Sequence, residues 1–159
     1  MERRADGYLV SSDPALWDAV AIHASLTTSY WAEGIPLDVV ERSLAASVGA
    51  GAYLEPDGRG GRTVQVGFAR VVTDRATFAW LCDVYVLPEH QGRGLAQRMM
   101  ALLLDLPELQ GLRRWMLGTR DAHSLYERFG FRPLPEPSRY LQLPSQAPYG
   151  PKRPPPTGS

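Results

Sequence analysis

The residues with the clearest chemical meaning are the two glycines in the segment Gln91-Gly-Arg-Gly-Leu-Ala96. They stand just before a stretch in which Leu95, Met99, Leu102 and Leu103 recur at helical spacing. The first amides of a helix have no acceptor within the helix, the helix dipole makes that end positive, and glycine lets a ligand approach the backbone closely. The segment therefore predicts a site for a phosphate or pyrophosphate at the start of a helix.

The same glycine pair has other interpretations. Taken alone, a Gly-x-Gly before a helix is equally consistent with a tight turn that binds nothing. A dinucleotide-binding motif would need a third glycine at the position of Gln97. A P-loop would need Gly-Lys-Ser/Thr, which the segment lacks.

A strand and a helix must flank this turn, and the sequence predicts both. Thr77 to Val86 favours a long strand that Pro88 ends, and the helix runs to about Leu106, before Pro107. Further strands are expected at 8–11, 52–55, 64–72, 114–118 and 140–143, with a hairpin loop at 56–62. Two helices are expected early in the chain: one runs from Asp13-Pro14 to about Leu26 with Leu16, Val20 and His23 on one face, and the next is opened by Ile35-Pro36 and bounded by Gly49 and Gly51. A short later helix is expected to be capped by Asp121 and to end at Gly130-Phe131. This order predicts an α/β fold, a mixed β-sheet flanked by helices on both faces in a single domain.

Composition narrows the class of protein. The chain has 159 residues, 44% of them hydrophobic, and a formal net charge of zero, so nothing in it favours nucleic acid or an anionic membrane as a partner. No apolar run approaches the roughly 20 residues of a membrane span, and the polar N-terminus is unlike a signal peptide. A single cysteine, Cys82, fits a cytoplasmic protein. Residues 1–144 are expected to form the domain, and the Pro/Gly-rich residues 145–159 a tail.

Four segments together resemble the GNAT (Gcn5-related N-acetyltransferase) superfamily. Gln91 to Ala96 is similar to its Gln/Arg-x-x-Gly-x-Gly/Ala signature. The other three segments follow the family's order, and they are Gln65-Val-Gly-Phe-Ala-Arg70, Val84-Tyr-Val-Leu-Pro88, and Ala122-His-Ser-Leu-Tyr126 with Gly130-Phe131. The likeness spans roughly residues 8–143. It implies the GNAT fold and an N-acetyltransferase that moves an acetyl group from acetyl-CoA to a primary amine by direct attack, through a tetrahedral intermediate.

The resemblance also implies residue roles. The amides of Gln91, Gly92, Arg93, Gly94, Leu95 and Ala96 would hold the CoA pyrophosphate, and the strand Val84, Tyr85, Val86 would pair with the pantetheine arm. An amide of that strand would polarise the thioester carbonyl. Tyr126 would lie near the sulfur and protonate the departing thiolate, or it is simply a core aromatic. Thr119 stands where many relatives carry Asn, so it offers one hydrogen-bonding group where they offer two.

The acceptor side is less determined. In the resembling fold the loop with Tyr30, Trp31 and Glu33 borders the acceptor, although its aromatic rings would equally serve to cover the sheet. Asp83 or Glu33 could take the amine's proton; alternatively, Asp83 pairs with an arginine or with backbone amides. The acceptor could be a small amine, an amino-acid-like compound, or a peptide N-terminus or lysine.

A rival interpretation from another class is a catalytically weak, CoA-binding regulatory or partner-docking domain. Turnover distinguishes this interpretation from the enzyme, since such a domain would bind CoA without acetylating any amine. No histidine pair has metal-ligand spacing, so no metal is expected. Cys82 is expected to be a small buried hydrophobe, with an acyl-cysteine route as its alternative. The sequence does not exclude a homodimer.

Overall fold

The sheet has six strands, and their order across the sheet follows their order along the chain. The computed structural model describes residues 1–56, 63–145 and 148–149. The strands are β1 (Glu2–Ala5), β2 (Tyr8–Ser11), β3 (Val48–Leu54), β4 (Val64–Thr73), β5 (Phe78–Val86) and β6 (Arg114–Leu117). Each neighbouring pair is antiparallel except β5 and β6, which run parallel.

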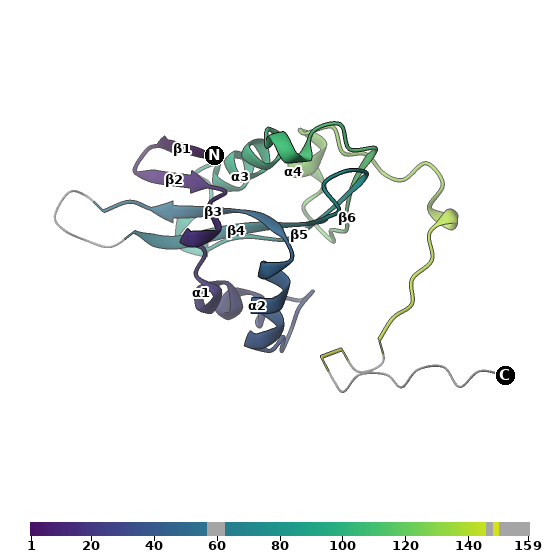
Figure 1. Cartoon of the computed structure of the whole chain (residues 1–159), viewed down its shortest axis with the longest axis horizontal. Coiled ribbons are helices and arrows are strands. Elements are labelled where there is room, and N and C mark those ends of the chain that lie inside the picture. The colour runs from purple at the N-terminus through teal and green to yellow at the C-terminus, as the bar shows by residue number, and fades with distance from the viewer. Residues whose placement is uncertain (57–62, 146–147, 150–159) are drawn as a thin grey trace.

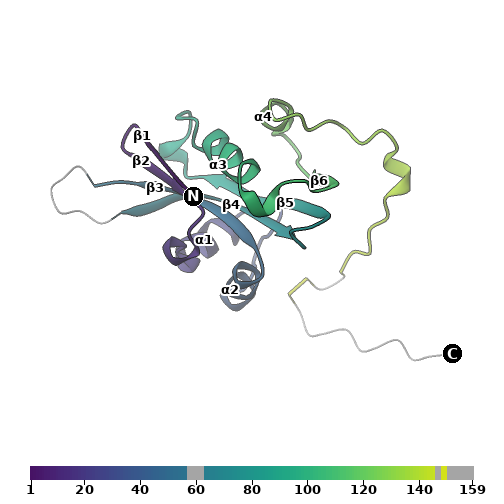
Figure 2. The same ribbon diagram turned by 45° about the horizontal axis from the view of Figure 1, so that its top comes forward.

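Helices cover both faces of the sheet, as Figures 1 and 2 show. Helices α1 (Ala19–Leu26) and α2 (Leu37–Ala45) lie on one face, and α3 (Leu95–Leu104) and α4 (His123–Glu127) lie on the other. Short 3-10 turns occur at 14–16, 88–90, 107–109 and 137–139. Each face has its own core, one built around the buried side of α3 and the other around Phe68. The predicted single-domain mixed sheet with two covered faces is therefore confirmed.

The first helix differs from the prediction. Asp13 and Pro14 open only a 3-10 turn, and α1 begins at Ala19, where the Asp18 carboxylate accepts from the amides of Val20 and Ala21 at 3.0 Å each. The helix consequently buries Ile22 and Leu26, while Val20 is 64% exposed. The expected face was wrong because a second capping aspartate, five residues on, sets the start of the helix.

Glycines 49 and 51 were expected to end a helix, and both instead lie inside β3. A Cβ added at Gly49 would stand 2.7 Å from Cζ of Phe68, so glycine is required there because the ring of Phe68 packs against the strand. The strand therefore begins at Val48, four residues before the expected Ala52. Strand β1, which pairs with β2, was not predicted.

The expected final strand at 140–143 does not form. Leu141 is 98% and Leu143 is 83% exposed, and the segment runs away from the body of the molecule (Figure 1). Alternating side chains favour extended backbone, but a strand also needs hydrogen bonds from a neighbour, and this segment pairs with none of the described strands. The expected hairpin loop and tail fall largely outside the described residues. Among the residues that are described, no helix has the length and apolar character to cross a membrane.

Candidate active site

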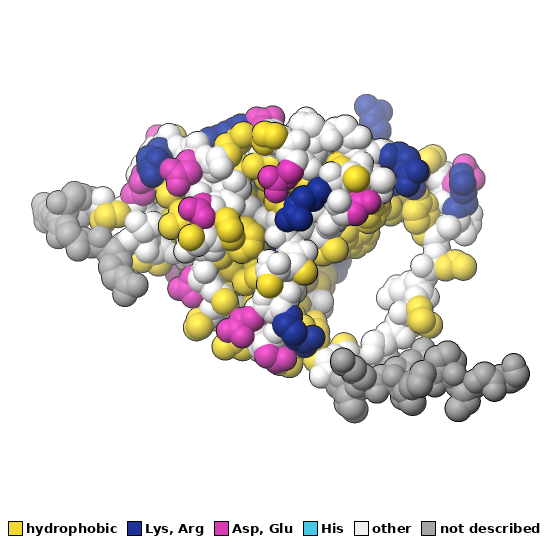
Figure 3. Space-filling model, viewed as in Figure 1, with side chains coloured by type: hydrophobic (Ala, Val, Ile, Leu, Met, Phe, Trp, Pro, Cys, Tyr) yellow, Lys and Arg dark blue, Asp and Glu magenta, His cyan; other side chains and the backbone are white. Residues whose placement is uncertain are grey.

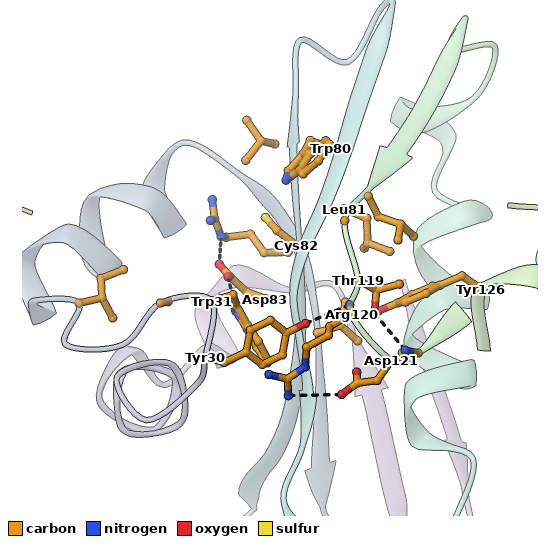
Figure 4. Close-up of a pocket in the computed structure, with 18 of the residues that line it drawn as sticks. Tyr30, Trp31, Trp80, Leu81, Cys82, Asp83, Thr119, Arg120, Asp121 and Tyr126 are labelled. Atoms are coloured by element: carbon orange, nitrogen blue, oxygen red, sulfur yellow. Dashed lines mark hydrogen bonds and ion pairs between the residues drawn. The ribbon is translucent and has the colours of Figure 1, made fainter. Parts of the chain in front are cut away.

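The site lies where the parallel strands β5 and β6 separate. Their pairing runs from Phe78 opposite Arg114 to Leu81 opposite Leu117, and β6 ends there. Strand β5 continues to Val86 with β4 on one side only. The backbone of residues 82–86 therefore has one edge without a strand partner in the described sheet, and this edge opens into the cavity of Figure 4.

A bulge in β5 decides which side chains face this opening. Tyr85 pairs with Phe68 and Cys82 with Arg70, so Asp83 and Val84 together oppose the single residue between, Ala69. Asp83 has φ of 54°, a left-handed conformation that Asp tolerates better than most residues. The extra residue shifts the alternation of side chains. As a result Val84 packs against the α3 core, Tyr85 packs against the α1–α2 core, and Asp83 points to the side opposite Val84.

Asp83 accepts hydrogen bonds on both carboxylate oxygens. Arg70 Nε donates to Oδ2 at 2.6 Å and Trp31 Nε1 donates to Oδ1 at 3.2 Å. The side chains of Arg70 and Asp83 are only 16% and 8% exposed, so this is a buried ion pair. Arg70 also donates to Ser47 Oγ at 3.1 Å. These contacts match the ion-pair alternative that the sequence leaves open for Asp83.

The loop between α1 and α2 is attached to both sides of the opening. Trp31 binds Asp83 of β5, and the hydroxyl of Tyr30 accepts from the backbone amide of Arg120, beyond β6, at 3.3 Å. The Arg120 guanidinium lies 3.9 Å from the centroid of the Tyr30 ring, and the rings of Tyr30 and Trp31 pack edge to face at 4.9 Å. Tyr30 and Trp31 thus form a wall of the cavity, whereas Glu33 is exposed and does not line it.

The cavity between the separating strands has a volume of about 630 Å³. Tyr126 of α4 enters it from the side opposite Asp83 (Figure 4). Burial, with smaller contributions from Tyr30 and Asp121, raises the pKa of the Tyr126 phenol to about 12. Its ring packs edge to face on Phe131, 6.0 Å away, and Gly130 takes the left-handed conformation expected after the helix. Because its pKa is about 12, the phenol of Tyr126 is protonated throughout the neutral pH range.

Thr119 supports the start of α4. Its Oγ1 accepts from the amide of Ala122 at 3.1 Å. The expected cap, Asp121, is exposed and instead forms an ion pair with Arg120 at 3.5 Å. The prediction for Asp121 was wrong because Thr119, three residues before Ala122, is the residue whose hydroxyl reaches the free amide. Thr119 also lines the cavity.

The predicted glycine turn before α3 lies at the other end of the opening, beside the end of β5. Gly92 and Gly94 have φ of 74° and 71°, and Gly94 is the N-cap of α3 with no side-chain cap. Leu95 as a whole is only 2% exposed, and its side chain packs into the α3 core. The Gln91 side chain donates to the carbonyl of Val86 at 3.0 Å, which ties the turn to the end of β5. Uncapped amides beside left-handed glycines suit a diphosphate.

Sequence reasoning missed Arg70, Trp80 and Arg120, all of which line the cavity. A signal existed for two of them. Arg70 is the single charged residue of a long apolar strand, and Trp80 lies between Ala79 and Leu81, which are buried on the opposite face. Arg120 has no local signal, because its role depends on Tyr30, which lies 90 residues away in the sequence.

Comparisons with known proteins agree with this geometry. Residues 52–133 match the acetyltransferase (GNAT) domain family. A protein of Gibberella zeae named as an acetyltransferase, FG08082, is 41% identical over an alignment of 135 positions, and the match covers 75% of each chain. The crystal structure of a Xanthomonas campestris pv. campestris protein, described as a GNAT-family acetyltransferase, is 45% identical with a TM-score of 0.78. The structural match covers 87% of this chain and 93% of the Xanthomonas protein.

A more distant structure shares the fold. This Clostridium acetobutylicum protein, described as an acetyltransferase and solved with acetyl-CoA, has a TM-score of 0.59 at 17% identity, and the likeness covers 91% of this chain and 96% of that one. The fold and the opening between β5 and β6 define an α/β transferase of the acetyltransferase class. The chain belongs to the GNAT family.

Proposed function

We propose that this protein transfers the acetyl group of acetyl-CoA to a primary amine by direct attack. One observation carries the proposal. The edge of β5 that has no strand partner in the described sheet connects the uncapped, glycine-bearing start of α3 with a cavity that a protonated phenol enters. The related fold of the Clostridium acetobutylicum protein solved with acetyl-CoA supports the choice of acetyl donor.

The donor would bind along this edge. The amides of residues 92–96, at the uncapped N-terminus of α3, are suited to hold the diphosphate. The amide of Gln91, which the sequence also suggested, already donates to the carbonyl of Pro88 at 3.2 Å. The free edge of β5 at Val84 to Val86 offers hydrogen-bonding groups to the amide-bearing arm, although the Val86 carbonyl already accepts from Gln91. Acetyl-CoA supplies a thioester whose carbonyl carbon is open to attack.

In the proposed reaction the amine nitrogen forms a bond to the carbonyl carbon, the carbonyl oxygen takes up negative charge, and the carbon–sulfur bond then breaks. Backbone amides of β5 beside the bulge would stabilise the oxygen. A phenol of pKa about 12 is too weak an acid to protonate fully a thiolate of pKa about 8.5. We therefore assign Tyr126 the role of hydrogen-bond donor to the departing sulfur, and the amine's proton passes to water.

Asp83 has a positioning role in this proposal. Both of its oxygens already accept hydrogen bonds, from Arg70 and from Trp31. It holds the loop wall against the bulge, and so shapes the acceptor cavity next to the strand that would bind the thioester. Proton removal by Asp83 is the competing role that a pH profile distinguishes.

The decisive test is thiol release from acetyl-CoA in the presence of a panel of primary amines, with mass spectrometry of the products. Acetylation of any amine, abolished by omitting acetyl-CoA, supports the proposal. Calorimetric binding of CoA without turnover of any amine would instead support the regulatory, CoA-binding domain. Absence of both binding and turnover would contradict the site itself.

A further inference from the structure

The acceptor side of the cavity has an unusual floor. Val72 and Trp80 are register partners on β4 and β5, on the face that α1 and α2 cover farther along the sheet. These two side chains are 44% and 37% exposed. A Cβ built at Gly118 would lie 3.8 Å from two ring carbons of Trp80, so the indole extends to the residue that follows β6, where the opening begins. The floor of the opening is therefore a flat aromatic surface exposed to solvent.

A second aromatic surface borders the same cavity. Trp31 is 44% exposed although its indole N–H is fixed on Asp83, and Tyr30 packs against its edge. The Arg120 guanidinium covers a face of the Tyr30 ring. Figure 4 shows Trp80 above Cys82 and Trp31 beside Asp83, both across the opening from Tyr126. Exposed aromatic rings held in place by hydrogen bonds are binding surfaces for apolar groups.

The charges of the cavity cancel. Among the residues described as lining it, the charged ones are Arg70, Asp83, Arg120 and Asp121. They form two pairs, Arg70 with Asp83 and Arg120 with Asp121. Acidic and basic side chains are likewise interspersed over the face of the molecule in Figure 3. The lining has no surplus acid for a polyamine and no surplus base for a phosphate or carboxylate.

From this surface we infer that the acceptor is a primary monoamine whose carbon skeleton carries a flat aromatic ring, and that Trp80 is the residue that selects it. The inference rests on the proposed acetyl transfer. An ammonium group entering between aromatic faces is attracted to them. The ammonium group then loses its proton to water, and the neutral amine attacks the thioester.

The test compares amines of graded aromatic character. We expect kcat/KM for 2-phenylethylamine and tryptamine to exceed that for propylamine at least about tenfold, because the ring buries apolar area on the cavity floor. Putrescine and glucosamine 6-phosphate are expected to be poorer than propylamine. If propylamine, putrescine or glucosamine 6-phosphate has a kcat/KM equal to or higher than that of the two aromatic amines, the inference is overturned.

A matched pair of variants locates the selectivity. Phe78 lies two residues before Trp80 on the same face of β5, is also 37% exposed, and does not line the cavity. Trp80→Ala is expected to remove most of the preference for 2-phenylethylamine over propylamine, and Phe78→Ala to leave the preference unchanged. Circular dichroism of both variants checks folding. Retention of the preference in Trp80→Ala, or its loss in Phe78→Ala, would contradict the assignment to Trp80.

A binding measurement separates this inference from the proposed reaction. Quenching of tryptophan fluorescence by 2-phenylethylamine is measured with CoA present, in the parent and in Trp80→Ala. Binding that depends on Trp80, with no turnover of any amine, would reject the acetyl transfer but keep the aromatic site. Turnover of aliphatic amines without binding of 2-phenylethylamine would reject the aromatic site alone.

Discussion

Replacing Asp83 by asparagine distinguishes a positioning residue from a general base. Asparagine has nearly the same shape, tolerates the left-handed backbone at this position, and can still accept from Trp31 through its amide oxygen. It cannot accept from Arg70 at the position of Oδ2, where the ion pair now measures 2.6 Å. The guanidinium would therefore stay largely buried without its counterion.

The expected loss of stability follows from this geometry. Removing one partner of a buried ion pair costs about 3–5 kcal/mol. Arg70 keeps its bond to Ser47 and its side chain is 16% exposed, so we expect the lower end, about 3 kcal/mol. For a chain of this length that corresponds to a fall in Tm of about 6–12 °C. Urea denaturation measures the free energy of unfolding directly.

The double variant Asp83→Asn with Arg70→Gln is the matched control. It removes the unpaired charge and allows two neutral amides to pair, so it should recover about half of the lost free energy. If the single variant unfolds within about 0.5 kcal/mol of the parent, the ion pair does not support the loop wall, and the structural argument fails.

Kinetics test the same substitution independently. The fraction of substrate present as free amine rises with pH equally for parent and variant. A positioning role therefore predicts that kcat of the variant is about tenfold lower than that of the parent at every pH from neutral to alkaline. A general base would become dispensable as free amine accumulates. A loss that shrinks steadily toward alkaline pH would show that Asp83 takes the proton, and would refute the positioning role.

Three further predictions follow from the same site. Tyr126→Phe should lower kcat about ten- to a thousandfold with little change in CoA affinity, and a kcat within twofold of the parent would remove Tyr126 from the mechanism. Gly94→Ala should raise the Kd for acetyl-CoA at least about tenfold. Gly111→Ala, which has the same φ of 71° away from the site, should affect stability alone, and equal Kd values in the two variants would reject the anion site. Burial raises the pKa of Cys82, Tyr85 and Tyr126 each to about 12, so the unfolded chain loses these protons first and the free energy of unfolding should fall between about pH 9 and 12. In Tyr126→Phe that decline should be shallower, by up to about 1.4 kcal/mol per pH unit. A free energy of unfolding that stays constant from pH 9 to 11 would contradict the burial of these groups.

The sequence by itself determined the parts of this protein that depend on consecutive residues. The strand that ends at Val86, the glycine turn and helix α3 follow from local spacing. So do Tyr126 and its packing on Phe131, because Gly130 reverses the chain within a few residues. These short-range features include most of the expected donor-binding residues.

Tertiary structure decided the acceptor side and the ends of the sheet. The ion pair of Asp83 joins residues 13 apart in sequence, and its bond to Trp31 joins residues 52 apart. The bulge that turns Asp83 toward them exists only in the register of β4 against β5. The segment at 140–143 has the alternation of a strand but pairs with none of the described strands, so its leucines stay exposed. Local pattern specifies a conformation, whereas a side chain's direction and partner depend on which distant strand or loop packs beside it.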